Sequence, residues 1–373
     1  MLKNLKITTK VVALTLFLLG FSGLIVVMLF NTMRSLSIEK SDLDILKQAQ
    51  SMTTEYSEEF SKIYALVESY AMSVENSILY KKSDRQDVVS MLERSLKNHP
   101  SIVAHGCGLE PNRFDGKDNM FRGNTKAGSD ADGRYLAYVS LDSSGNALVD
   151  VLTGYDMPGD GDWYIVPMKT GETFVSEPYY YDIAGVSTLM FTISAPIKID
   201  GKPIGVVTAD ISLHPVQEKI QKSLITEEDV KSVMTTESGY IVASSLDTLR
   251  IGGNVKDTVF ETSLKAQESI LVTDVEGLSR SQVIAKAEVT IGNADQSWYF
   301  FRVVPAGAAY KNYKFQRDVT IAIIVIALVG AIVMAWLIRR SIRKPIQLFQ
   351  ASMGTVSSGD LRSMQSFGSK DEL

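Results

Sequence analysis

Two long apolar segments dominate the hydrophobic pattern of the chain. Residues 11–30 (VVALTLFLLGFSGLIVVMLF) and residues 319–338 (VTIAIIVIALVGAIVMAWLI) each run for 20 positions without a charged residue. About 20 apolar residues in a helix cross a hydrocarbon core about 30 Å thick. We therefore predict two transmembrane helices. The alternative for the first segment is a cleaved signal peptide, which is disfavoured because the segment is long and no small-residue cleavage site follows it.

Positive charges lie at the outer ends of the two apolar segments, before the first and after the second. They are Lys3, Lys6 and Lys10 before the first segment, and Arg339, Arg340, Arg343 and Lys344 after the second. Cytoplasmic flanks of membrane helices carry an excess of Lys and Arg. We therefore expect a multi-pass protein of the bacterial cytoplasmic (inner) membrane. Residues 1–10 would be cytoplasmic, and residues 31–318 would be periplasmic or extracellular.

The first part of the outer segment has a helical pattern. Residues 35–79 contain neither Pro nor Gly. Apolar side chains recur there at steps of three or four, at Tyr56, Phe60, Ile63, Val67, Tyr70, Val74 and Ile78. This spacing predicts one long helix with a narrow apolar seam. The distal half of the seam would pack on its own domain, whereas the proximal half would pair with a second subunit in a homodimer.

After this helix, short β-prone runs alternate with loops rich in Gly, Asp and Asn. The predicted strands cover 103–109, 135–141, 147–152, 189–193, 195–199 and 203–210, then 232–235, 239–243, 270–275, 281–287 and 298–304. Helices are predicted at 84–97 and 215–223, and Asp200-Gly201 predicts a hairpin turn. The expected fold class is α+β: a long helix, a membrane-distal lobe at about 80–213 and a membrane-proximal lobe at about 223–305, joined near residues 213–222.

Composition narrows the possible functions. The chain has 373 residues, of which 45% are hydrophobic and 22% charged, with a formal net charge of −5. This balance is typical of a folded protein and argues against a nucleic-acid partner. The single cysteine, Cys107, excludes an intramolecular disulfide and a thiolate zinc cluster, and we expect it to be a small core residue. The sequence has no P-loop, no Gly-x-Ser-x-Gly and no paired histidines, so we expect no enzyme, cofactor or metal.

Aromatic residues and carboxylates gather between residues 155 and 210. The predicted ligand-binding residues are Tyr155, Asp160, Asp162, Trp163, Tyr164, Tyr180, Asp182 and Asp210. Aromatic faces and carboxylates together suit a small cation, and no Lys or Arg lies between Tyr155 and Lys169. The alternative is that the aromatic residues are core or edge-strand residues. The aspartates at 156, 160 and 162 lie in a Gly-rich loop, where they would be solvated or, less consistently with their spacing, would bind calcium.

The outer segment resembles the double-Cache (dCache_1) sensor domain of bacterial methyl-accepting chemotaxis proteins. The features that carry the resemblance are Trp163-Tyr164, residues 177–182 (EPYYYD), 194–197 (SAPI), 205–210 (GVVTAD) and 239–244 (GYIVAS). Residues 339–373 resemble the start of a HAMP signal-relay domain, with Pro345 after the second span and Gly359-Asp360-Leu361 further on. Pro345 is expected to end one helix and begin another. The resemblance implies two PAS-like Cache lobes.

The resemblance also bears on the ligand. Many relatives that bind amino acids have an Arg two residues before the Trp-Tyr pair, which holds the ligand's carboxylate, and a later Asp that holds its amino group. Here the position of that Arg is Gly161, followed by Asp162, whereas the later Asp is similar to Asp210. A Tyr-x-Asp element is present at residues 180–182. The resemblance therefore implies a mono-, poly- or quaternary amine.

Together these features predict a transmembrane chemoreceptor. It would sense a small amine in the distal lobe and relay the signal through the second span and the HAMP segment to cytoplasmic signalling partners, by way of a region beyond Leu373. Two alternatives stay open: an amino-acid-sensing chemoreceptor, and the input module of a sensor histidine kinase or diguanylate cyclase.

Overall fold

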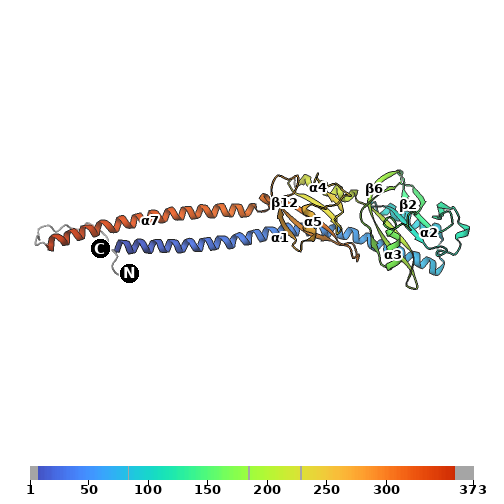
Figure 1. Cartoon of the computed structure of the whole chain (residues 1–373), viewed down its shortest axis with the longest axis horizontal. Helices are drawn as coiled ribbons and strands as arrows, with labels where there is room; N and C mark the ends of the chain where they lie inside the picture. Colours follow the sequence, from blue (N-terminus) through green and yellow to red (C-terminus); the bar gives the residue numbers. More distant parts are fainter. Residues whose placement is uncertain (1–6, 83, 184, 227–228, 358–373) are drawn as a thin grey trace. The chain divides into compact units, whose positions relative to one another are not determined.

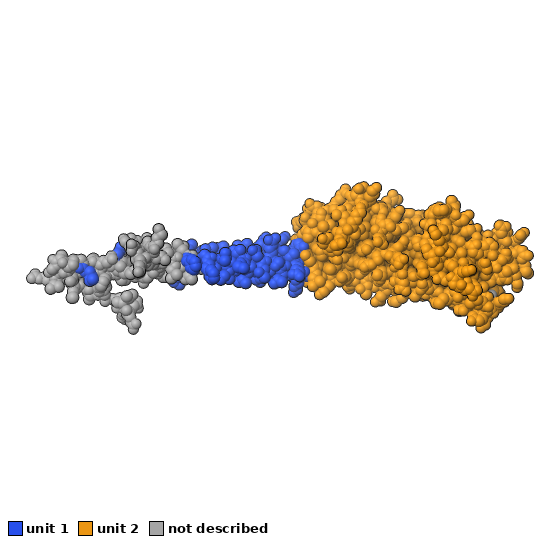
Figure 2. Space-filling model, turned by 60° about the horizontal axis from the view of Figure 1, so that its bottom comes forward, with its two compact units in different colours: residues 1–41, 310–373 blue, residues 42–309 orange. Residues whose placement is uncertain are grey.

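The computed structural model describes residues 7–357 except 83, 184, 227 and 228 (Figure 1). The chain divides into two compact units, which Figure 2 shows in different colours. One unit comprises residues 1–41 and 310–373, and the other comprises residues 42–309. Two long helices belong to the first unit in whole or in part, α1 (Ile7–Tyr80) and α7 (Lys311–Ser357).

The helical segments Gly20–Tyr80 and Lys311–Met334 of α1 and α7 each contain a stretch that is long and apolar enough to cross a membrane. Large apolar side chains are exposed along them, such as Phe21 and Ile326. The hydroxyl of Ser37 donates to Gln316 Oε1 over 2.6 Å and links the two helices. The expected helix break at Pro345 is wrong, because α7 continues through this position. A proline removes one backbone N–H donor and so weakens a helix locally, but here the helix continues past it. The predicted turn at residues 359–361 lies outside the described residues.

The distal lobe is built on a seven-stranded antiparallel sheet. Its strand order is β3-β2-β1-β7-β6-β4, with β5 also paired to β6. The strands are β1 (Ile102–Leu109), β2 (Leu136–Leu141), β3 (Ala147–Val151), β4 (Phe174–Val175), β5 (Tyr179–Ile183), β6 (Val186–Ile199) and β7 (Lys202–Ser212). Its helices are α2 (Arg85–Asn98) and α3 (Asp162–Thr170), with 3-10 turns η2 (Asp118–Met120) and η3 (Thr125–Ala127). The Asp200-Gly201 turn joins β6 to β7 as predicted, and both residues have positive φ.

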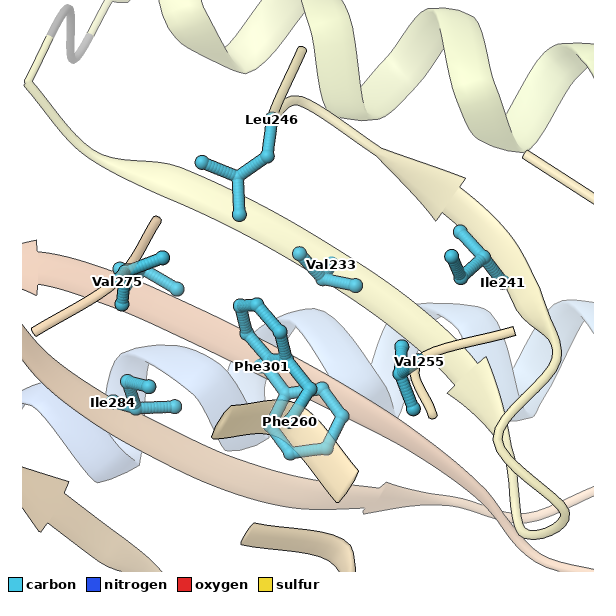
Figure 3. Packing of buried hydrophobic residues seen from close by; sticks show 9 residues of the cluster. Val233, Ile241, Leu246, Val255, Phe260, Val275, Ile284 and Phe301 are labelled. Atoms are coloured by element: carbon cyan, nitrogen blue, oxygen red, sulfur yellow. The ribbon is translucent and has the colours of Figure 1, made fainter. Parts of the chain in front are cut away.

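The proximal lobe is built on a five-stranded antiparallel sheet with the order β10-β11-β12-β8-β9. The strands are β8 (Lys231–Thr236), β9 (Ile241–Ser244), β10 (Ile270–Thr273), β11 (Gln282–Val289) and β12 (Trp298–Pro305). The helices are α4 (His214–Thr226), α5 (Val259–Lys265) and α6 (Ala306–Ala309). Figure 3 shows buried side chains of this core, among them Phe301 of β12 and Phe260 of α5. Their rings meet edge-to-face with centres 5.3 Å apart.

The apolar seam of α1 packs on the lobes of its own chain. Tyr56, Phe60 and Val67 are at most 1% exposed. The ring of Phe60 lies 5.4 Å from Phe191 of the distal lobe and 5.4 Å from Trp298 of the proximal lobe. The seam therefore contributes to the core at the junction of the two lobes. Pairing of the proximal part of α1 with a second subunit stays a prediction.

The predicted α+β class, with a long N-terminal helix and two lobes, is confirmed. Some local predictions are corrected. Trp163-Tyr164 lie on α3 and not on an edge strand, and Asp162 is the first residue of that helix. The predicted strands 189–193 and 195–199 are one strand, β6, because Ser194 stays paired in the ladder. The helix predicted at 215–223 is present as α4 (His214–Thr226), within the segment expected to join the lobes.

Candidate ligand-binding site

A cavity of about 730 Å³ opens in the distal lobe where it meets the proximal lobe. Its acidic lining residues are Asp160, Asp162, Glu177 and Asp210. Its aromatic lining residues are Tyr138, Trp163, Phe174, Tyr179, Tyr180, Tyr181 and Tyr240. Among the described residues that line it, none is Lys or Arg. The cavity therefore combines negative charge with aromatic faces, the two features that stabilise a bound cation.

Asp210 is the most deeply buried of these acids, with 4% of its surface exposed. It lies on β7, directly across from Thr192 on β6. The hydroxyl of Thr192 donates to Asp210 Oδ1 over 2.7 Å, and the hydroxyl of Tyr138 donates to Oδ2 over 2.8 Å. Burial raises the pKa of Asp210 to about 6, and the two hydrogen bonds counteract part of this effect because they favour the charged form.

Glu177 supplies a second carboxylate, in the segment between β4 and β5. Its Oε2 atom is buried and has no hydrogen-bond partner among the described residues. A buried polar atom without a partner costs about 1–3 kcal/mol, and more when it is charged. An N–H donor brought by a ligand would satisfy this oxygen. Glu177 belongs to the EPYYYD segment, but the sequence did not mark it as a binding residue.

Asp160 and Asp162 lie on the rim of the cavity, where the chain enters α3. Asp162 Oδ1 accepts a hydrogen bond from the backbone N–H of Gly159 over 3.0 Å, which closes the turn before the helix. A side chain at Gly161 would not fit, since its Cβ would lie 2.5 Å from the carbonyl oxygen of Gly154. The glycine therefore lets the rim loop fold back closely on itself and places both acids beside the cavity.

Five of the predicted site residues line the cavity: Asp160, Asp162, Trp163, Tyr180 and Asp210. The other three are outside the lining and have other partners. Tyr164 accepts a hydrogen bond from Arg134 over 2.7 Å and donates to Glu110 over 2.5 Å. The ring of Tyr155 lies 4.6 Å from the Arg134 guanidinium. Asp182 accepts from the backbone N–H of Gly185 over 2.8 Å in the β5–β6 turn.

The structure adds residues that the sequence did not single out. Tyr138 and Thr192 hold the Asp210 carboxylate, and Glu177 adds the second acid. Tyr240 and Gln296 come from the proximal lobe. Tyr138 and Thr192 could have been found only from the strand register, because each sits opposite or near Asp210 in the sheet and far from it in sequence.

The sequence comparisons all match the chain to methyl-accepting chemotaxis proteins. The family model described as "Methyl-accepting chemotaxis protein-like, first PDC sensor domain" matches residues 88–218. The chain is 30% identical over 142 residues to the methyl-accepting chemotaxis protein TlpQ of Pseudomonas aeruginosa, a match that covers 36% of this chain and 20% of TlpQ. It is 27% identical over 221 residues to PscA of Pseudomonas syringae pv. tomato, covering 59% of this chain and 34% of PscA. The chain thus spans only a minor part of these relatives.

Among solved structures, the extracellular domain of the candidate histidine kinase mmHK1S-Z2 has a similar fold. Its TM-score is 0.61 at 21% sequence identity, and the match covers 74% of this chain and 99% of that domain. At this level of identity the likeness concerns the fold alone.

Proposed function

We propose that this chain is the sensory part of a transmembrane chemoreceptor that binds a small cationic amine. The match of residues 88–218 to the methyl-accepting chemotaxis protein-like first PDC sensor domain and the similarity to TlpQ support this proposal. The resemblance to the Cache sensor domains of chemoreceptors, predicted from the sequence, is confirmed. The cavity of the distal lobe would hold the ligand. On this proposal the chain is a sensor and not an enzyme.

The single observation that carries the amine proposal is the charge of the cavity. Two buried or half-buried carboxylates, Asp210 and Glu177, face it together with several aromatic rings, and no described lining residue is a cation. A buried carboxylate without a counter-ion is costly. An ammonium group would offset this cost, donate to the orphaned oxygen of Glu177 and gain cation–π attraction from the rings.

The same observation disfavours a free amino acid as ligand. An α-carboxylate would need a cation in the cavity, and none of the described lining residues is Lys or Arg. Arg134, which contacts Tyr155 and Tyr164, is engaged elsewhere. Its side chain donates to the carbonyl of Leu109 and to Glu110, and its guanidinium lies against Tyr155. The acids Asp160 and Asp162 at the entrance would repel an approaching carboxylate.

The remaining parts of the proposal concern the membrane. Residues 11–30 and 319–338 would be the spans, residues 31–318 the periplasmic or extracellular sensor, and residues 339–373 the start of a HAMP domain that relays the signal to chemotaxis partners. A homodimer would be the working unit. The alternative output, a histidine kinase or diguanylate cyclase, uses the same kind of input segment, and the likeness to mmHK1S-Z2 concerns that shared fold.

A binding experiment on the 373-residue chain in detergent tests the proposal. Thermal shift and calorimetry would compare ethylammonium, tetramethylammonium and 1,4-diaminobutane with acetate and common L-amino acids. We expect stabilisation by at least one amine, and its loss in Asp210→Asn. Asp150→Asn is the matched control, because Asp150 is exposed on β3 and outside the cavity. Stabilisation by L-amino acids and by none of the amines would refute the amine proposal.

A further inference from the structure

Two residues of the proximal lobe, Tyr240 and Gln296, line the cavity of the distal lobe. Tyr240 lies in the turn between β8 and β9, and Gln296 lies in the loop of residues 290–297 between β11 and β12. The Gln296 amide makes no hydrogen bond with any described residue, and its side chain is half-buried. An amide carbonyl accepts hydrogen bonds and an amide N–H₂ donates them, so Gln296 can bond to a ligand in the cavity through either group.

The loop that carries Gln296 is fastened to α1. The backbone N–H of Thr290 donates to the hydroxyl of Ser57 over 2.9 Å. Two residues on, the N–H of Gly292 donates to the hydroxyl of Ser61 over 2.9 Å. Gly292 has φ +56°, and a Cβ built there would lie 2.4 Å from the ring of Tyr64. The loop therefore lies against one face of α1, where it contacts Ser57, Ser61 and Tyr64.

The end of the loop is held by the aromatic cluster at the junction of the lobes. Trp298 follows the loop directly, and its ring lies 4.7 Å from Phe191 and 5.4 Å from Phe60, edge-to-face in both cases. Phe191 precedes Thr192, the residue that donates to Asp210. Residues 290–297, which we name the relay loop, therefore have anchors on α1 at one end and an aromatic anchor beside the cavity strand β6 at the other.

We infer that the ligand is bound from both lobes, with Gln296 and Tyr240 as binding residues of the proximal lobe, and that the relay loop transfers the occupancy of the cavity to α1. A ligand with N–H donors would be held by the carboxylates of the distal lobe and by the Gln296 carbonyl. A ligand that bonds to both lobes stabilises one arrangement of the relay loop relative to others. The contacts of the relay loop with Ser57, Ser61 and Tyr64 transmit this preference to α1. The inference rests on the proposed function in that the cavity holds a ligand, but it does not require the natural ligand to be an amine.

A covalent probe tests the relay independently of the natural ligand. Thr153 lines the cavity and is exposed, so Thr153→Cys in the full chain can react with 2-aminoethyl methanethiosulfonate, which forms a disulfide-linked ammonium and releases methanesulfinate. Cys107 is completely buried and would stay unmodified. Methyl methanethiosulfonate gives an uncharged label of smaller size as the control. Mass spectrometry verifies that labelling is complete.

The readout is hydrogen exchange of the relay loop and of α1 around residues 57–64. We expect the ammonium label, and not the methyl label, to slow exchange in both segments by several-fold. Gln296→Ala and Gln296→Met should abolish this slowing, whereas Asn293→Ala, an exposed position of the same loop, should preserve it. Ser57→Ala with Ser61→Ala should keep the slowing in the loop and lose it in α1.

Equal exchange with and without the ammonium label would overturn the inference, and so would Gln296 variants that behave like Asn293→Ala. Failure of the proposed function is a separate outcome. In that case no free amine stabilises the unmodified chain, but the ammonium label still slows hydrogen exchange in the relay loop and α1. This result would refute the amine proposal and support the coupling of the cavity to α1.

Discussion

The hydroxyl of Tyr138 donates to Asp210 Oδ2 over 2.8 Å and so joins β2 to the buried acid of the cavity lining. Thr192 donates to the other oxygen over 2.7 Å, and the hydroxyl of Tyr179 lies 2.6 Å from that of Thr192. The carboxylate is thus held in one orientation by neutral groups. Because none of these groups carries a positive charge, burial still dominates and the pKa of Asp210 rises to about 6.

This pKa predicts how amine binding depends on pH. Only the ionised form of Asp210 attracts an ammonium group, so affinity should be constant above about pH 7 and fall about tenfold per pH unit below pH 6. Calorimetric titration between pH 5 and pH 8 with the tightest-binding amine measures the profile. Tyr138→Phe removes a donor that favours the charged form, so its profile should begin to fall at a higher pH. Equal affinity at pH 5 and pH 8 would contradict the assignment of Asp210 as the cation's partner.

The same buried acid should reduce the stability of the ligand-free protein. The pKa of Asp210 is about 6 in the folded chain and 3.8 ordinarily, so the folded state binds the proton more tightly. Its contribution to stability is therefore fully present below about pH 4 and is lost as pH rises through 6, at a cost of about 3 kcal/mol. Asp210→Asn should stabilise the ligand-free chain at pH 8 by up to about that amount and leave it nearly unchanged at pH 4. Urea unfolding compared with Asp150→Asn measures this, and a destabilised Asp210→Asn at pH 8 would disprove it.

His105 should change stability with pH in the direction opposite to Asp210. It is fully buried, with Nδ1 2.9 Å from the carbonyl oxygen of Thr208 and Nε2 2.9 Å from the Ser95 hydroxyl. Burial lowers its pKa from 6.5 to about 4, so the unfolded chain binds the proton first. The stability due to neutral His105 is present above about pH 6.5 and is lost as pH falls through 4, again about 3 kcal/mol.

The opposing effects of His105 and Asp210 predict that these two groups together add little to the pH dependence of stability between pH 4 and pH 6.5. His105→Gln removes one effect, so this variant should become more stable on acidification across that window. Asp210→Asn removes the other, so it should become less stable. Unfolding free energies measured at four or five pH values would reveal the two slopes, and parallel profiles in the two variants would show that one of the groups is not titrating as its burial implies.

The sequence was sufficient for the architecture and for part of the site. The long α1 seam, the two sheets and the Asp200-Gly201 hairpin follow from periodicity and turn chemistry, which are local signals. Asp210 could be selected because a carboxylate at the end of an apolar strand needs a partner.

The partners of Asp210 could not be predicted, because they depend on strand register. Counted from the two-residue turn, the residue opposite Asp210 would be Phe191, which packs in the aromatic cluster. A register shift between Ile197 and Lys198 instead brings Thr192 opposite Asp210. A one-residue shift of register exchanges the side chains of β6 that share a face of the sheet with Asp210. The local sequence gives no clear sign of such a bulge. The contributions of Tyr240 and Gln296 depend on how the two lobes pack, which is equally absent from local sequence.

Arg85 supports a final prediction about the stability of the distal lobe. It is the first residue of α2 and is 1% exposed, yet it carries a charge. Its Nη2 lies 2.9 Å from Asp115 and 2.6 Å from Asp118, its Nη1 donates to the carbonyl of Gly133 over 2.6 Å, and its guanidinium lies 4.3 Å from the centre of the Phe121 ring. These contacts fasten the long loop between β1 and β2 to the start of α2.

Removal of Arg85 would leave two acids without their buried partner. Arg85→Ala should therefore cost about 3–5 kcal/mol, measured by urea unfolding at pH 7. Arg85→Met combined with Asp118→Asn should cost less than Arg85→Met alone, because the second change removes one of the uncompensated charges. Asp132→Asn is the matched control, since Asp132 is an exposed acid of the same loop and should change stability by less than about 0.5 kcal/mol. If Arg85→Ala and Asp132→Asn had similar small effects, the buried ion pairs would not hold the loop, and its order would have to come from the aromatic contacts of Phe114 and Tyr135, whose ring centres lie 4.9 Å apart.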